Sequence, residues 1–144
     1  KDLTPPRELT GEVFNPPLVH ALDISADGSL LACARGDGSV TLQQLPCGEW
    51  LEVDSAHAGA TTFVTFPKFS KNDHLLSSGA DGCIKMWQID SEDKEDSRIP
   101  YDMFQLVHFK HGKQINWITS MPDTPTGNVF VCDPSGDISA YNVV

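Results

Sequence analysis

Short apolar runs recur along the chain, and turn residues separate each run from the next. The run Ile84-Lys85-Met86-Trp87 places bulk on both of its faces, as expected when a small sheet lies between two neighbours. Helical periodicity is absent, and Asp-Gly or Ser-Gly pairs favour tight hairpin turns between the runs. The pattern predicts an all-β fold, with strands within residues 18–24, 30–34, 40–45, 63–66, 75–78, 84–89, 115–118, 129–132 and 138–143.

The predicted strands fall into three segments that share one layout. Gly38, Gly82 and Gly136 are 44 and 54 residues apart. When these glycines are aligned, the apolar positions around them coincide. His57 and His111 are also 54 residues apart. Two anchors with the same offset indicate an internal repeat in which each unit forms one small sheet.

The second repeat carries an ordered set of polar residues. His57 comes first, Ser77 and Asp81 border a hairpin turn, and Trp87 closes the following strand. This order resembles the WD-repeat family. The resemblance implies four-stranded blades of a β-propeller, with a hydrogen-bonded chain through these four residues inside the blade.

Hydrogen-bonding chemistry supports such a chain. Asp81 can accept from one imidazole nitrogen of His57, the other nitrogen can accept from the Ser77 hydroxyl, and that oxygen can accept from the Trp87 indole, so every buried polar group has a partner. The other two repeats depart from the pattern, and we expect their blades to rely on packing alone. Their aligned residues are Val13, Cys33, Asp37 and Gln43 in the first repeat, and His111, Val131, Ser135 and Tyr141 in the third.

The length of 144 residues corresponds to three blades, since a blade takes about 40 to 45 residues. Closed propellers need about four to eight blades. We therefore expect about three four-stranded blades that belong to a longer, seven-bladed propeller, or that close a ring with a second copy. The expected divisions are 1–14 as a linker or stray strand, 15–55, 56–89 and 106–144 as WD repeats, and 90–105 as an acidic loop.

Composition narrows the classes of partner. Twenty acidic residues against ten basic ones give a formal net charge of −10, which repels a phosphate backbone and argues against direct nucleic-acid binding. No apolar run is long enough to cross a bilayer. The four cysteines form no closely spaced pair, which favours a reducing compartment, the cytoplasm, the nucleus or both.

The resemblance implies a non-catalytic scaffold that binds proteins or peptides and needs no cofactor. Narrower alternatives are a substrate receptor of a cullin-based ubiquitin ligase, which would dock a cullin adaptor, and a reader of chromatin or other basic peptides, for which the acidic charge is suited. The stretch from Trp87 to Asp90 lacks the arginine of the Trp-Asp-x-Arg docking sequence. Partner-binding candidates, from the loops and the channel rim that propellers use, are Arg35, Thr61, Asn116 and Trp117.

Two chemical alternatives are weaker. His57, Ser77 and Asp81 are also the residue types of a hydrolase triad, but Ser77 lies within a predicted strand and lacks the sharp turn of a nucleophile. His108 and His111 are three residues apart without further ligands nearby in sequence, so no metal site is expected. We therefore expect no enzyme activity.

Overall fold

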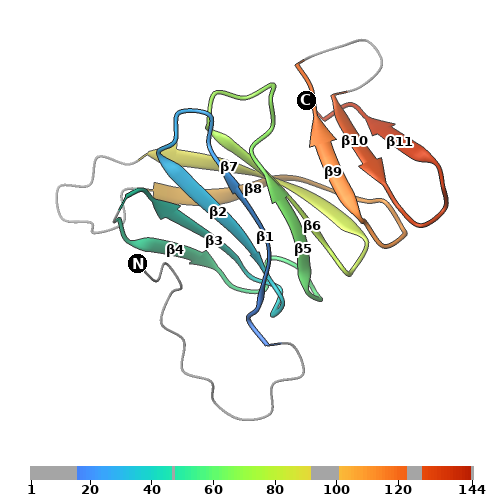
Figure 1. Ribbon diagram of the computed structural model, residues 1–144, viewed down its shortest axis with the longest axis horizontal. Coiled ribbons are helices and arrows are strands. Elements are labelled where there is room, and N and C mark those ends of the chain that lie inside the picture. The colour runs from blue at the N-terminus through green and yellow to red at the C-terminus, as the bar shows by residue number, and fades with distance from the viewer. Residues whose placement is uncertain (1–15, 47, 92–100, 123–127, 144) are drawn as a thin grey trace.

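The structure is a computed structural model that describes residues 16–46, 48–91, 101–122 and 128–143 (Figure 1). These residues form antiparallel strands in three separate sheets. The strands are β1 (Val19–Ile24), β2 (Leu30–Arg35), β3 (Val40–Gln44), β4 (Trp50–Val53), β5 (Thr61–Thr65), β6 (His74–Gly79), β7 (Cys83–Ser91), β8 (Tyr101–Lys110), β9 (Trp117–Ser120), β10 (Val129–Cys132) and β11 (Ile138–Tyr141).

Each sheet is a meander in which consecutive strands are neighbours. Blade 1 has the order β1-β2-β3-β4, blade 2 has β5-β6-β7-β8, and blade 3 has β9-β10-β11. The aligned glycines Gly38, Gly82 and Gly136 all have positive φ values, of 86°, 72° and 86°, at the turn between the second and third strands. The repeated glycine thus supplies the left-handed conformation that the hairpin needs. The predicted all-β fold of propeller blades is confirmed.

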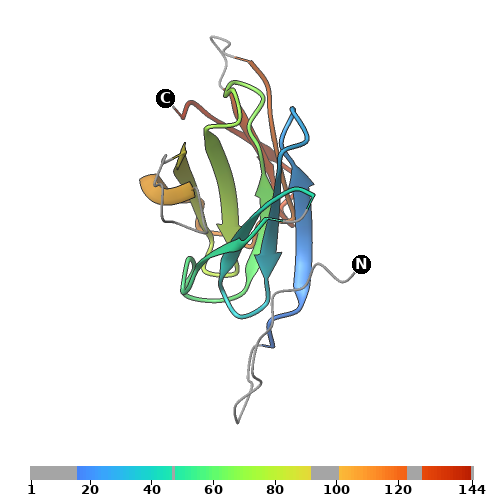
Figure 2. The same cartoon turned by 90° about the vertical axis from the view of Figure 1, so that its left-hand side faces the viewer.

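The blades stack side by side through their faces. The first strands are neighbours across the blades, because β1 contacts β5 and β5 contacts β9. In the view of Figure 2, turned by 90°, β1 and β8 lie at opposite sides of the molecule. The first strand and the fourth strand therefore form opposite borders of the stack.

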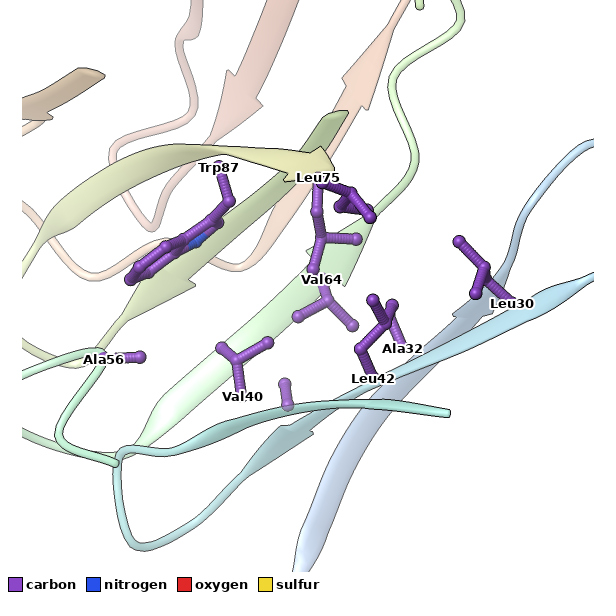
Figure 3. Close-up of a cluster of buried hydrophobic side chains, with 10 residues drawn as sticks. Leu30, Ala32, Val40, Leu42, Ala56, Val64, Leu75 and Trp87 are labelled. Carbon is purple, nitrogen blue, oxygen red and sulfur yellow. The ribbon is translucent and has the colours of Figure 1, made fainter. Parts of the chain in front are cut away.

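One hydrophobic core lies between blades 1 and 2 (Figure 3). Blade 1 contributes Val40 and Leu42, and blade 2 contributes Val64, Leu75 and Trp87, all of them buried. Each such side chain stabilises the fold by about 1.5–3 kcal/mol when it is fully buried. A second core lies between blades 2 and 3, and it contains Leu76, Ile84, Met86, Ile115, Ile118, Val129, Val131 and Val143.

The fourth strands of blades 1 and 2 were not among the predicted runs. β4 packs Leu51 and Val53 against the first core, and β8 packs Tyr101 and Met103 against it. The expected acidic loop, 90–105, is correspondingly shorter: β7 continues to Ser91 and β8 begins at Tyr101, while 92–100 and the segment 1–14 lie outside the described residues. No helix in the described part of the chain could cross a membrane.

Candidate functional site

Blade 2 contains a continuous chain of side-chain hydrogen bonds. The Trp87 indole Nε1–H donates to Ser77 Oγ over 2.8 Å, and the Ser77 hydroxyl lies 2.8 Å from His57 Nε2. His57 Nδ1 lies 3.2 Å from Asp81 Oδ1. Because an ionised carboxylate can only accept, Nδ1–H donates to Asp81, and Nε2 is left to accept from the Ser77 hydroxyl. The structure thus brings together all four residues of the predicted set, in the predicted order.

Burial and hydrogen bonding shift the two ionisable groups of this chain. Burial lowers the pKa of His57, and the neighbouring Asp81 opposes the shift without cancelling it. Asp81 has a lowered pKa although its own burial acts in the opposite direction. The backbone N–H groups of Cys83 and Ala58, which both donate to the Asp81 carboxylate over 3.0 Å, lower that pKa. The network therefore pairs a neutral imidazole with an ionised carboxylate.

Gly79 allows the imidazole to approach the second strand. A Cβ atom at this position would lie 2.5 Å from His57 Cγ and Nδ1, and 2.7 Å from Asp81 Oδ1. The position where any other residue would place its side chain is already filled by the histidine ring. This glycine is required by a close approach and not by its backbone conformation.

Blade 3 has a polar network of its own, so the expectation of packing alone is wrong there. His111 Nε2 lies 2.7 Å from Asp133 Oδ2, and His111 Nδ1 lies 2.7 Å from the Tyr141 hydroxyl. The serine of the set is replaced by Val131, which is buried in the second core. The Tyr141 hydroxyl bonds the histidine directly, with no serine between them.

Asp133 explains why this network was missed. In the glycine alignment its position is that of Gly79, whose missing Cβ would point into the histidine ring. An aspartate at this position therefore reaches the ring. Ser135, which is aligned with Asp81, instead donates its backbone N–H to Asp133 over 2.6 Å. Hydrogen bonds from Ser135 and from His111 hold the pKa of Asp133 well below its ordinary value.

Blade 1 lacks a histidine network within its described residues. Asp37 accepts from the backbone N–H and the hydroxyl of Ser39, over 3.1 and 2.7 Å. Gln43, aligned with Trp87, donates to the carbonyl oxygen of Gly48 over 3.1 Å. Cys33 is buried in β2, and Val13 lies outside the described residues. The two bonds from Ser39 to the retained aspartate fix the hairpin turn.

A hollow of about 490 Å³ is formed by the first strands of the three blades. We call it the inner hollow, and its described lining consists of residues 20–23, 62–65 and 116–119. The rings of Phe63 and Trp117 lie against each other with centroids 4.7 Å apart. Trp117 is 58% exposed, which is unusual for so large an apolar side chain. Trp117 thus presents aromatic surface to this hollow and also to a second hollow, which it lines with Phe130 and Ile138 on blade 3.

The four partner-binding candidates divide into two pairs. Asn116 and Trp117 are exposed and line the inner hollow. Arg35 and Thr61 are buried, and neither side chain is available on the surface. Arg35 donates to the carbonyl oxygen of Pro17 over 3.0 Å, and Thr61 begins β5 with its own carbonyl 3.1 Å from His20 Nδ1. Sequence reasoning named two residues of this lining, but it did not name Phe63, His20 or Asp23, which also line the hollow.

The geometry gives no support to the hydrolase triad or to a metal site. The Ser77 side chain is completely buried and its hydroxyl is bonded to both Trp87 and His57, so it cannot meet a substrate in this arrangement. Across the four described stretches, no three histidine, cysteine, aspartate or glutamate side chains are grouped closely enough to hold a metal ion. The His57-Ser77-Asp81 cluster is therefore structural.

Comparison with known families agrees with the fold. The family model for the WD domain, G-beta repeat, matches residues 4–42 and 48–88, which is more than half of the chain. The chain belongs to the WD-repeat family. Propeller domains of this family generally mediate protein interactions, and WD repeats indicate an interaction scaffold.

Two curated relatives match different shares of this chain. A WD repeat-containing protein 53 homolog from Dictyostelium discoideum is 24% identical over 148 residues, covering 91% of this chain and 38% of that protein. A ribosome biogenesis protein WDR12 homolog from Chlamydomonas reinhardtii is 49% identical over 43 residues, covering 30% of this chain and 10% of the relative. The chain thus spans less than half the length of either relative.

Two solved structures show the same architecture. The WD40 domain of SCAP from fission yeast superposes with a TM-score of 0.57 at 16% identity, over 85% of this chain and 28% of that one. The Cps50 (Swd1) β-propeller domain of Myceliophteria thermophila gives 0.51 at 12% identity, over 85% of this chain and 40% of that one. These similarities establish the fold.

Proposed function

We propose that this chain contributes to a protein-interaction scaffold and that its partner binds across the inner hollow, with Trp117 as the central contact. The observation that carries the proposal is the exposed Trp117 ring, fixed against Phe63 where the first strands of three blades meet. First strands surround the central channel of a propeller. On this proposal the hollow forms part of a channel wall, where a peptide can contact three blades at once.

The lining chemistry suits a peptide. Apolar and aromatic surface alternates there with the side chains of Thr62, Asn116 and Thr119. Exposed tryptophan is enriched among residues that dominate binding energy, because one rigid ring supplies a large contact area. Asn116 is exposed in the same lining, and its amide can both donate and accept hydrogen bonds.

Quantitative affinity capture tests this function. The wild-type chain, Trp117→Ala and a matched control, Ile138→Ala, would be used as baits in cell extract, each after a thermal melt has shown that it is folded. Ile138 is 76% exposed on the same blade and shares the second hollow with Trp117, but it does not line the inner hollow, so this control separates the two surfaces of Trp117. We expect partners retained by wild type and Ile138→Ala to be lost by Trp117→Ala. Equal recovery by all three baits would contradict the proposal.

Narrower roles stay predictions. Docking of a cullin adaptor follows from the resemblance alone, and the sequence at Trp87-Gln88-Ile89-Asp90 does not supply the expected arginine. A role in reading basic peptides has a specific observation in its favour, which is the charge of the hollow and of the chain.

A further inference from the structure

We propose that the inner hollow binds a peptide through a positively charged side chain, arginine above all, which stacks on Trp117. The inference rests on the proposed function and adds the chemistry of the partner. It does not follow from the WD-repeat fold, because the fold fixes neither the charge of the lining nor the presence of an exposed aromatic ring.

The first argument is the charge of the lining. Asp23 is the one acidic residue of the described lining, which contains neither lysine nor arginine. The carboxylate is held in place from two blades: its Oδ1 accepts from the Ile24 N–H over 2.9 Å, and its Oδ2 accepts from the Thr65 hydroxyl and the Phe66 N–H over 2.8 and 2.9 Å. A fixed negative charge in a hollow attracts cations more strongly than a mobile surface carboxylate would.

The second argument is the aromatic pair. The tilted contact with Phe63, at an interplanar angle of 51°, holds the Trp117 ring while more than half of its surface is exposed. Tryptophan is the aromatic side chain that attracts cations most strongly, and the planar guanidinium of arginine can lie flat on it. Asn116 is exposed in the same lining, and its amide can hydrogen-bond the bound peptide.

The third argument is the field of the whole chain. A formal net charge of −10 repels acidic peptides and draws basic ones toward the surface. Lining charge, an exposed indole and net charge thus select the same class of ligand. Aliphatic peptides would satisfy the ring but would gain nothing from Asp23.

The test is a titration of the folded chain, in which the indole N–H signals of Trp50, Trp87 and Trp117 are followed by NMR. The probes are Gly-Arg-Gly and Gly-citrulline-Gly, both blocked at their ends. Citrulline keeps the planar shape of arginine but carries no charge, and a carbonyl oxygen replaces one of its N–H donor groups. We expect a saturable shift of the Trp117 signal, with the arginine peptide binding about two- to fivefold more tightly. The preference should shrink as salt is added.

Variants separate the contributions. Asp23→Asn should reduce the preference for arginine over citrulline, whereas Ile138→Ala should leave it unchanged. Equal binding of both peptides would overturn the inference. A Trp117 signal that shifts no more than the signals of Trp50 and Trp87 would overturn it as well. Partner capture that still depends on Trp117 would then leave the proposed function standing, so the two failures can be told apart.

Discussion

Replacing Ser77 with alanine tests the blade 2 network most sharply. The hydroxyl is the common partner of the Trp87 indole N–H and of His57 Nε2, each 2.8 Å away. Its loss leaves two buried polar groups unsatisfied, and each such group costs about 1–3 kcal/mol. We therefore expect the free energy of unfolding to fall by about 2–6 kcal/mol, a large share of the about 5–15 kcal/mol that stabilises a typical domain.

Ser78→Ala is the matched control, because Ser78 is the next residue of β6 and is equally buried. Among the described residues, its hydroxyl hydrogen-bonds only the Thr62 hydroxyl, at 3.1 Å, and the Thr62 hydroxyl also lies 3.3 Å from the Ser78 carbonyl oxygen. Losing one replaceable hydrogen bond should cost about 0.5–1.5 kcal/mol. Urea unfolding followed by circular dichroism measures both variants, and a Ser77→Ala cost no greater than that of Ser78→Ala would refute the reasoning.

Four further predictions concern the same networks and the hollow. Gly79→Ala should destabilise the chain by about 1–3 kcal/mol in urea unfolding, because its Cβ would meet the His57 ring. The lowered pKa of buried His57 makes the unfolded state bind more protons below pH 6.5, so stability should fall as the pH drops below that value, and His57→Gln should flatten the slope. The pKa of Asp133 is lowered from 3.8, so its contribution is present above that pH and is lost in stronger acid; Asp133→Asn should remove this acid-dependent part of the unfolding curve. Trp117→Ala should lower stability by less than about 1.5 kcal/mol in a urea melt while it abolishes partner capture, since it loses one aromatic contact on an exposed face.

Spacing and residue type were sufficient for the blade framework. Turn glycines and apolar runs located three strands of every blade, and the hydrogen-bonding capacity of His57, Ser77, Asp81 and Trp87 indicated how they connect. The fourth strand β8 was harder to recognise, because polar and apolar residues do not alternate along it and a bulge interrupts its pairing opposite Met86 and Trp87.

The site required three-dimensional information for a different reason. Asp133 takes the role of Asp81, but in the glycine alignment it stands two positions earlier, where the second repeat has Gly79. Only the direction of the Gly79 Cβ bond shows that a side chain at this position reaches the histidine ring. Likewise, Arg35 is one of few basic residues in the chain, but its guanidinium is turned inward to Pro17. Exposure and side-chain direction depend on neighbouring blades, which local sequence does not describe.

Photo-cross-linking at the inner hollow tests the central claim most directly. A benzoyl-phenylalanine would replace Asn116, which is exposed on the hollow, and in a parallel variant would replace Phe104, which is 51% exposed on β8 at the outer border of blade 2. The account predicts covalent adducts with a captured partner from position 116 and not from position 104. Adducts from position 104 alone would place the partner on the outer strand and contradict a scaffold that binds across its inner hollow.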